Sequence, residues 1–373
     1  MTGPVEPIGR GQFFLLVAIS VVAGGVYIWP QAVLAAAGQN AVWSLVGSVA
    51  LAGATTWAHG LWGEWAGGPH YLAAAERTWG WARWGPFAVT VALCLAVESA
   101  FVALFAQMLH VLFYVATPLV VLRLLIILLA GWFASKPLNG LARNVQFWFP
   151  LVIFSFLFLW VAGMFQARDW PAALPSNVVS LVDIARGILM TWYLWIQGAV
   201  LVTLAPHVSD TPARRVRRIA VAAILAQGVI LLMIYVLVTA TLGPEAAQHL
   251  EWPLIFVVSN LNFSSAFISR PGVFILLGWV AALILHVSVH LYCGATNLAA
   301  AFGGHGDQEG RRRLLVAAFA LVLAVASSVY TSPSETTDWV LKVVDPWALG
   351  WCLLILPASL AVMWWRRRVR PAA

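Results

Sequence analysis

The chain has 373 residues, of which 62% are hydrophobic and only 9% are charged. Its mean hydropathy is +0.88. A soluble domain carries about 25% charged residues, so this composition cannot supply a water-facing surface. Disordered chains are polar or charged, and that class is excluded as well. The composition therefore predicts a multi-pass helical membrane protein, and the 21 tryptophans suit the membrane–water interfaces.

The 21 basic residues outnumber the 14 acidic ones, which gives a net charge of +7. We interpret this excess as membrane topology and expect no nucleic-acid partner, because a nucleic-acid footprint needs basic residues clustered on a folded soluble face. Cys94, Cys293 and Cys352 lie in apolar stretches without CxxC or zinc-type spacing. No cofactor or metal is predicted. The chain also lacks a phosphate-binding loop, a nucleophile elbow and a kinase signature, so we do not expect an enzyme.

Ten apolar stretches are long enough to cross a bilayer, which takes about 20 residues. In chain order they cover residues 11–36, 40–62, 86–116, 118–135, 142–166, 181–207, 216–242, 271–302, 314–331 and 346–365. These ten spans use most of the chain and form a single transmembrane domain. The longest connection, about 243–270, is expected to carry a short helix on the extracytoplasmic surface.

Basic residues alternate from side to side along these spans. With a cytoplasmic N-terminus, 16 of the 21 lie in the cytoplasm: Arg10, Arg77, Arg83, Lys136, Arg143, Arg214, Arg215, Arg217, Arg218, Arg311, Arg312, Arg313, Arg366, Arg367, Arg368 and Arg370. Because this bias sets orientation, it favours ten spans with both termini cytoplasmic. The clusters at 214–218 and 311–313 are interpreted as stop-transfer charges beside anionic lipid. Arg123, inside the fourth span, is interpreted as snorkelling to the headgroups.

The first span is interrupted by its own sequence, Val22-Ala23-Gly24-Gly25-Val26-Tyr27-Ile28-Trp29-Pro30. Each glycine weakens a helix by about 1 kcal/mol relative to alanine, and Pro30 removes a backbone donor. A helix broken inside the bilayer usually lines a cavity, where its backbone groups bind a substrate or an ion. We therefore predict ligand binding by Ala23, Gly24, Gly25, Val26 and Tyr27. A proline kink with close glycine packing is the alternative.

The sixth span contains a weaker interruption at Gln197-Gly198, close to Trp195. Spans one and six occupy corresponding positions if the ten helices form two inverted sets of five. Paired interruptions of this kind mark binding sites in transporters. We therefore expect Trp195, Gln197 and Gly198 to contribute to the ligand site, with one repeat at about 11–166 and the other at about 181–365.

Glu98 is the only acidic residue that the sequence places well inside a span. It lies about twelve residues into the third span, near the midplane at about 1.5 Å per residue. A carboxylate there costs a few kcal/mol, which makes Glu98 a functional candidate. A structural hydrogen bond to a neighbouring helix is the alternative.

The eighth span carries His286, Ser288 and His290. The two histidines are four residues apart and so share one helix face. A zinc site normally has three or four ligands, and a third is not evident from spacing. Two interpretations stay open: a ligand-site face that binds and releases protons, or plain helix–helix hydrogen bonding.

Several motifs resemble those of the B subunit of endospore germination receptors, within the amino acid–polyamine–organocation transporter superfamily. The resemblance extends over nearly the whole chain, with the motifs in the family's order and spacing. They are Gly25-Val26-Tyr27-Ile28-Trp29-Pro30, Ala35-Ala36-Ala37-Gly38-Gln39-Asn40-Ala41, Gly140-Leu141-Ala142-Arg143, Gly243-Pro244-Glu245 and His286-Val287-Ser288-Val289-His290-Leu291-Tyr292.

The resemblance implies a LeuT-type five-plus-five inverted repeat with broken helices one and six. It also implies a transporter-like pocket that senses a nutrient germinant, usually an amino acid. Partners would be an A subunit and a lipoprotein C subunit in the spore inner membrane. One departure is the stretch Gln197-Gly198-Ala199-Val200, where the family often has an acidic residue.

Two functions follow from different classes: a germinant receptor subunit, and a stand-alone proton-coupled amino-acid symporter. A bare scaffolding role is third. The first two share one pocket, which we expect between spans one, three, six and eight. We also expect Glu98 and His286 to belong to one polar network beside it.

Overall fold

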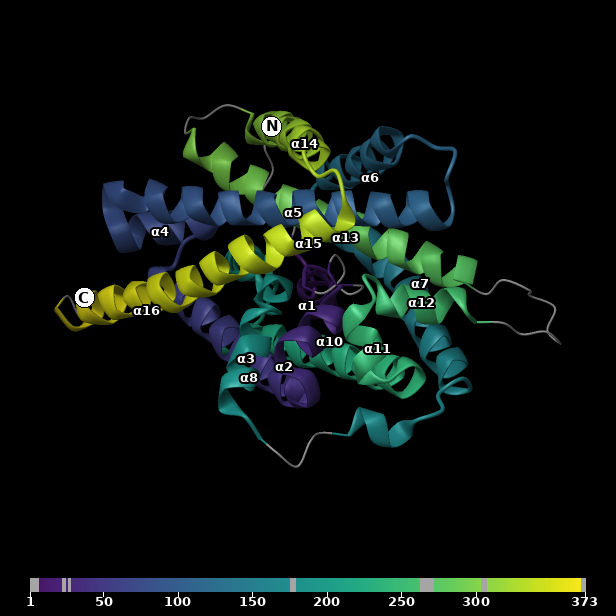
Figure 1. Ribbon diagram of the computed structural model, residues 1–373. Helices are drawn as coiled ribbons and strands as arrows, with labels where there is room; N and C mark the ends of the chain where they lie inside the picture. Colours follow the sequence, from purple (N-terminus) through teal and green to yellow (C-terminus); the bar gives the residue numbers. More distant parts are fainter. Residues whose placement is uncertain are drawn as a thin grey trace.

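The computed structural model describes residues 7–21, 25, 28–174, 179–261, 272–302 and 307–369. Within these ranges the chain is helical, and the extended pairing is limited to an isolated bridge between Ile8 and Val208. The predicted all-α class is confirmed. Figure 1 shows the helices coloured along the chain.

The first half of the chain supplies the helices of the predicted spans one to five. They are α1 (Arg10–Ile19), α2 (Trp29–Ala37), α3 (Ala41–Ala66), α4 (Tyr71–Trp79), α5 (Trp84–Leu112), α6 (Leu119–Ala134) and α7 (Leu138–Met164). Short 3₁₀ turns flank them: η1 (Gly38–Asn40), η2 (Gly80–Arg83) and η3 (Trp170–Ala173).

The second half supplies the helices of the predicted spans six to ten. They are α8 (Leu181–Leu189), α9 (Gly198–Leu204), α10 (Ala213–Leu242), α11 (Pro244–His249), α12 (Pro253–Ser259), α13 (Gly272–Ala301), α14 (Gln308–Ser328), α15 (Pro333–Trp339) and α16 (Asp345–Val369). Two 3₁₀ turns, η4 (Trp192–Trp195) and η5 (Ala205–His207), flank α9, and a π turn, η6 (Val340–Val344), precedes α16.

Six helical segments among the described residues are long and apolar enough to cross a membrane, or seven with one bent pair. The chain is therefore a multi-pass membrane protein. Three predicted spans have no member of this set to themselves. The first is divided between α1, which is too short, and α2, which forms one segment with α3. The fourth and ninth correspond to α6 and α14, which fall outside the set. The 16 residues of α6 are short for a span, and α14 begins with three consecutive arginines.

Both predicted interruptions coincide with gaps between helices. The first span is divided between α1, which ends at Ile19, and α2, which begins at Trp29. In the sixth span, α8 ends at Leu189 and helix resumes with a bend of 56°. We call the segment between α8 and α9, which contains η4, the second break. The described residues between α1 and α2, which are Ser20, Val21, Gly25 and Ile28, are called the first break.

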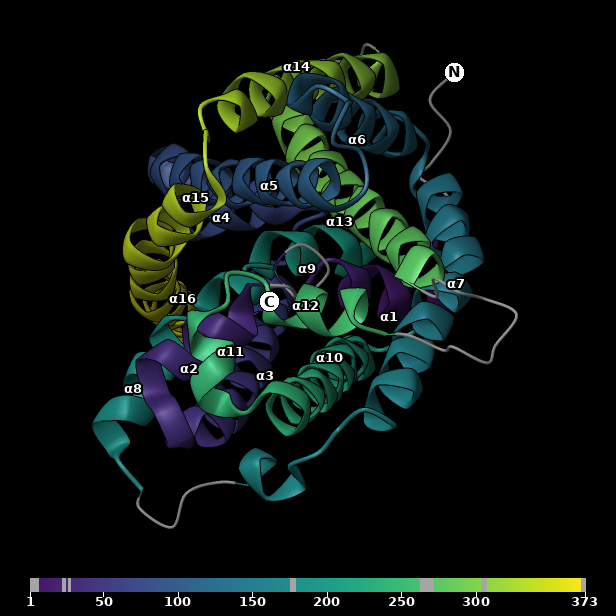
Figure 2. The same ribbon diagram turned by 45° about the vertical axis from the view of Figure 1, so that its right-hand side comes forward.

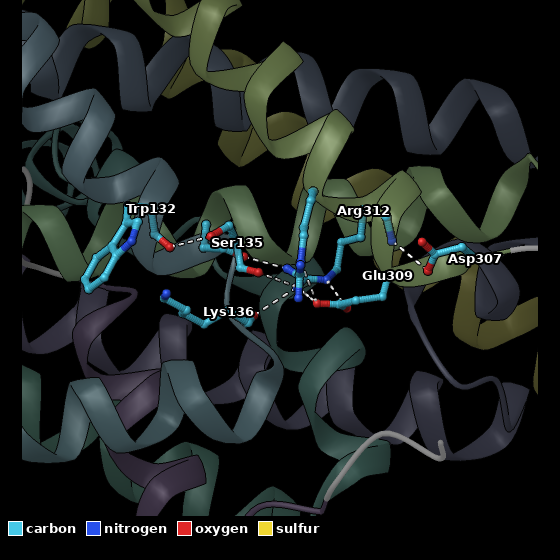
Figure 3. A network of polar contacts seen from close by, with 9 residues as sticks. Trp132, Ser135, Lys136, Asp307, Glu309 and Arg312 are labelled. Atoms are coloured by element: carbon cyan, nitrogen blue, oxygen red, sulfur yellow. Dashed lines mark hydrogen bonds and ion pairs between the residues drawn. The ribbon is translucent and has the colours of Figure 1, made fainter. Parts of the chain in front are cut away.

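Two buried arginines fasten α6 and α14 to each other. The Arg123 guanidinium donates to the carbonyl of Tyr330, just beyond the end of α14, at 2.7 Å. The Arg312 guanidinium donates to three carbonyls at the end of α6, those of Ala134 (2.5 Å), Ser135 (2.9 Å) and Lys136 (3.0 Å) (Figure 3). Each arginine thus satisfies carbonyls that have no partner within their own helix.

The two contacts are reciprocal. Arg123 follows the first residue of α6 by four positions, and Arg312 follows the first residue of α14 by four. Each contact also reaches a further helix, since Gln107 of α5 donates to the Tyr330 carbonyl at 3.4 Å and Arg312 lies 4.6 Å from the ring centre of Tyr292 in α13.

These contacts correct two interpretations from the sequence. Arg123 does not snorkel, and Arg312 is not a lipid-facing stop-transfer charge, because their exposed fractions are only 7% and 4%. A planar guanidinium donates in several directions at once, so it can close a helix end that a single ammonium cannot.

The helices fall into two groups. Figures 1 and 2 show α6 and α14 side by side along one edge, with α2, α3, α8 and α10 on the opposite side. We call α5, α6, α13 and α14, which pack on one another, the frame. On the other side α3 packs on α8, α9 and α10, and α1 packs on α10. Because α1 also contacts α13, the first break lies where the two groups meet.

Replacing Arg312 with lysine tests whether the hydrogen bonds of Arg312 to the end of α6 stabilise the frame. Arg312→Lys keeps the charge but removes most of the donors to α6, and each hydrogen bond to a charged group contributes about 1.5–3 kcal/mol. We expect a melting temperature several degrees lower for the purified protein in detergent. Arg313→Lys is the matched control, since Arg313 is exposed and pairs only with Glu309 among the contacts described for it. Equal melting temperatures for the two variants would contradict the proposed fastening.

Candidate ligand site at the two breaks

A small cavity lies between the end of α1, α5, the second break and α13. Its empty space totals about 220 Å³ with the open side included, and it has room for about one water molecule. These elements belong to the predicted spans one, three, six and eight. Its apolar lining includes Val21, Val97, Phe101, Tyr193, Leu194 and Ile196. Its polar lining includes Glu98, His286 and His290. Two larger cavities, of about 620 and 520 Å³, share Cys94 with it.

The three polar side chains meet in one cluster. The Glu98 Oε1 atom is 3.0 Å from His286 Nε2 and 3.6 Å from His290 Nε2. The Glu98 and His286 side chains are almost fully buried, with exposed fractions of 4% and 3%. The structure thus brings together the acid predicted from the third span and both histidines predicted from the eighth.

Both histidines also contact the last residues of the first helix. His286 Nδ1 is 3.0 Å from the Ile19 carbonyl, and His290 Nε2 is 3.0 Å from the Ser20 carbonyl. A carbonyl oxygen only accepts, so each of these ring nitrogens carries a hydrogen and donates it. Carbonyls at a helix C-terminus lack partners inside the helix. The frame therefore satisfies the backbone of α1 where that helix stops.

The same geometry allows Glu98 and His286 to share a proton. Since Nδ1 of His286 already donates to Ile19, neutral His286 has only an acceptor at Nε2. The Glu98 Oε1 atom lies 3.0 Å from Nε2, but Nε2 makes no directed hydrogen bond to a described residue, so the contact is one of close charges. With one proton, the pair is either imidazolium with carboxylate or imidazole with carboxylic acid. In both cases the cluster holds one exchangeable proton.

The cluster is also the one group among the described residues whose nitrogen and oxygen atoms lie close enough to hold a metal ion. A zinc ion takes two histidines and a glutamate in some catalytic sites. Here His290 already uses Nε2, the atom that faces Glu98, to donate to Ser20. A metal would have to displace that hydrogen bond, so the observed arrangement fits a proton better.

The two breaks pack directly on each other at Gly25 and Tyr193. The Tyr193 hydroxyl donates to the Gly25 carbonyl at 3.5 Å, and the Tyr193 ring meets Phe101 edge-on at 5.9 Å. A Cβ atom at Gly25 would lie 2.5 Å from Tyr193 and 2.8 Å from Leu194. Close glycine packing, the alternative from the sequence, is therefore present, and its partners line the cavity. Four further predicted residues lie outside the described part of the chain: Ala23, Gly24, Val26 and Tyr27.

The other predicted residues contact neighbouring helices instead of the 220 Å³ cavity. Trp195 donates to Ser48 of α3 at 2.7 Å, and Gln197 donates to Thr56 of α3 at 2.9 Å. The Ser288 hydroxyl donates back to the Ile284 carbonyl within α13.

Gly198, also predicted, starts α9 against the ring of His59, which would lie 2.3 Å from an added Cβ. Trp195 and Gly198 do line the 620 Å³ cavity.

The sequence analysis missed a second intramembrane acid. Asp345 is fully buried, and its carboxylate accepts a hydrogen bond from the backbone amide of Tyr193. The expectation that Glu98 is the only acid inside the spans is wrong, because Asp345 directly precedes the residue at which the tenth span was predicted to begin. The sequence signal was an aspartate at the start of an apolar helix, where such residues cap free amides.

Comparisons with known proteins bear on the family and the fold of the chain. The sequence matches the family described as spore germination protein over residues 8–336. No curated protein matches it in sequence.

Among solved structures, MhsT in complex with L-phenylalanine superposes with a TM-score of 0.70 at 14% identity, covering 96% of this chain and 99% of that chain. A substrate-bound, outward-open Na⁺-coupled sialic acid symporter gives 0.67 at 10% identity, covering 93% of this chain and 78% of that chain. These similarities establish the fold, which is that of LeuT-type transporters.

A side chain at Gly25 should disturb both breaks. We expect Gly25→Val to lower the melting temperature in detergent, because its Cβ would push on Tyr193 and Leu194, and overpacking costs about 1–3 kcal/mol. Gly11→Ala on α1 is the control, since an added Cβ there has no atom within 4 Å. A Gly25→Val protein as stable as the control would show that the breaks do not pack together as described.

Proposed function

The chain belongs to the spore germination protein family, and from that premise we propose that it is the membrane subunit of a nutrient-germinant receptor. In this proposal it binds a small germinant, an amino acid, in the cavity between the breaks and signals germination. Its partners are the receptor's A and C subunits, and its location is the spore inner membrane. The observation that carries the proposal is the Glu98–His286–His290 cluster, which joins the frame to α1 beside that cavity.

The cavity offers complementary groups to an amino acid. The Glu98 Oε2 atom is buried and has no hydrogen-bond partner among the described residues, so it can accept from an ammonium group. The carboxylate of the germinant is proposed to lie beyond this lining, at the first break, because α2 begins there and a helix N-terminus favours an anion. Apolar residues line the remainder. L-Phenylalanine in MhsT is a ligand of this kind in the same fold.

Ligand binding at this place would act on the contacts between frame and α1. An ammonium group beside Glu98 competes with His286 for the carboxyl group. When that balance changes, the hydrogen bonds from His286 and His290 to Ile19 and Ser20 change with it. A ligand shifts a conformational equilibrium only through such differential contacts. In the receptor, the displaced first break would pass the signal to the other subunits.

The alternative is a stand-alone proton-coupled amino-acid symporter, and the proton between Glu98 and His286 favours it specifically. The two functions share the cavity and differ in whether the transport cycle completes. Uptake of a radiolabelled amino acid into proteoliposomes containing only this chain, driven by a proton gradient, separates them. We expect no accumulation, and gradient-dependent accumulation would favour the symporter.

We further propose ten spans in two inverted sets of five, with both termini cytoplasmic. The reciprocal arginines support this arrangement. Arg123 lies in the fourth predicted span, and Arg312 lies in α14 two residues before the start of the ninth. These two spans are equivalent under a five-plus-five repeat. The rotation that relates two inverted repeats would place α6 on α14 and Arg123 on Arg312. It would also place the carbonyl at the end of α14 on the carbonyls at the end of α6.

Topology is tested by labelling single cysteines introduced at positions 342 and 370. Lys342 is exposed, so a cysteine there is open to reagent. We expect an impermeant maleimide added outside to label position 342 and not position 370. The parent chain is the control, since its three cysteines are buried or half-buried. If both positions react from the same side, the ten-span topology is wrong.

A double-mutant cycle tests the receptor proposal, using Glu98→Gln, His286→Gln and the double variant. Spores are exposed to each common amino acid, and the half-maximal concentration is measured for those that germinate them. Removing one partner leaves the other unsatisfied, so each single variant should respond more weakly. The pair should couple by about 0.5–3 kcal/mol. Ser288→Ala, which removes a hydroxyl bonded only within α13, is the control.

Membrane abundance of each variant is measured alongside. Coupling near zero, with normal germination of both single variants, would show that the two residues are unrelated structural groups. A defect accounted for entirely by lost protein would reduce Glu98 to a role in folding.

A further inference from the structure

Asp345 is a buried carboxylate that the ligand chemistry above does not use. It is the first residue of α16 and follows the π turn η6. Its exposed fraction is 0%, and its Oδ2 atom has no hydrogen-bond partner among the described residues. A carboxylate in the membrane costs several kcal/mol if it is charged, and single π turns frequently occur at functional sites. A role beyond helix packing is therefore worth seeking.

The contact that Asp345 makes is with the backbone of the second break. Its Oδ1 atom accepts from the amide of Tyr193, which is the second residue of η4. The first amides of a helical segment have no acceptor within that segment. In lipid such groups need partners from elsewhere. The carboxyl group of Asp345 supplies such an acceptor in either protonation state, because one oxygen always remains free to accept.

Tyr193 is the residue that connects this backbone contact to the cavity. Its ring lines the cavity and packs on Phe101, and its hydroxyl reaches the Gly25 carbonyl. Tyr193 thus donates two hydrogen bonds: its amide to Asp345 of α16 and its hydroxyl to Gly25 of the first break. A shift of the Tyr193 backbone would move the aromatic wall of the cavity.

The other side of Asp345 connects to the frame. The chain runs from Tyr330, whose carbonyl accepts from Arg123, through α15 and η6 to Asp345. The rings of Tyr330 and Trp339 lie 5.5 Å apart along this route. The carboxylate therefore reaches the second break from a segment that is itself fastened to the frame.

We propose that Asp345 is a positioning residue of the ligand site. Its carboxylate fixes the second break through the Tyr193 amide, and so sets the place of the Tyr193 ring relative to Gly25 and the cavity. Asp345 does not contact the ligand. The identity of the ligand rests on the function proposed above, whereas the positioning of the break does not.

Amide hydrogen–deuterium exchange on the purified full-length chain tests the positioning directly. Asp345→Ala removes the acceptor, and we expect exchange over residues 192–195 to become about 10- to 100-fold faster, which is the equivalent of leaving one buried donor without a partner. Asp345→Asn keeps a weaker oxygen acceptor and should fall between the alanine variant and the wild type. The control is Asp338→Ala on α15, an exposed carboxylate paired with Lys342 at 2.6 Å, which should exchange like the wild type.

Ligand affinity supplies the second readout. Thermal stabilisation of each variant is titrated with the common amino acids, L-phenylalanine included. Where the wild type is stabilised, Asp345→Ala should need about tenfold more ligand, and Asp345→Asn should recover part of that loss. Asp338→Ala should titrate like the wild type.

Unchanged exchange over 192–195 in Asp345→Ala would overturn the proposal. Faster exchange spread evenly over all helices would also overturn it, because Asp345 would then be only a stabilising residue. If the alanine variant does not accumulate, the test uses Asp345→Asn instead. An exchange rate over residues 192–195 equal to that of the wild type would then contradict the proposal. If no amino acid stabilises the wild type, the proposed function is contradicted. The exchange experiment alone then tests the role of Asp345.

Discussion

A backbone interrupted inside a bilayer must find hydrogen-bond partners on other helices, and this requirement organises the structure around its two breaks. At the first break, His286 and His290 donate to the last carbonyls of α1. At the second break, Asp345 accepts from the amide of Tyr193. The free carbonyl oxygens at the end of α1 are thus paired with imidazole donors, and the free amide of Tyr193 is paired with a carboxyl acceptor. These partners are titratable or charged, so the same contacts that complete the backbone can respond to a proton or to a charged ligand.

The same requirement explains the frame. Arg123 and Arg312 close the ends of each other's helices, and Arg312 in addition pairs with Glu309 at 2.7 Å (Figure 3). Because α6 and α14 are fastened at both ends, the histidines of α13 and the carboxyl group of α5 project from a fixed surface. The first broken helix is joined to this surface by the hydrogen bonds from His286 and His290, so a change in those bonds would let it change position relative to the frame. Motion of one group of helices against another around a fixed site is the usual mode of transport in such folds.

Composition and apolar length were sufficient to predict the membrane class. Each of the ten predicted stretches overlaps at least one helix, and six or seven segments among the described residues are long and apolar enough to span a membrane. The nearness of Glu98 to His286 could be anticipated, because few polar residues occur at mid-membrane and they tend to pair. Arg123 and Arg312 were misinterpreted, and Asp345 was missed, for a common reason. Their partners are backbone groups of residues distant in the chain, which no local pattern reveals. Gln197 and Ser288 are polar and buried as expected, yet Gln197 donates its hydrogen bond to Thr56 and Ser288 donates its own to the Ile284 carbonyl.

The central claim is that one proton, held between Glu98 and His286, responds when an amino acid occupies the cavity. Calorimetric titration of the purified chain with a germinating amino acid, in buffers of different ionisation enthalpy, counts the protons exchanged on binding. The account predicts a binding enthalpy that depends on the buffer for the wild type, with an exchange of up to one proton. It predicts no such dependence for Glu98→Gln. Binding by the wild type with no dependence on the buffer would contradict the account.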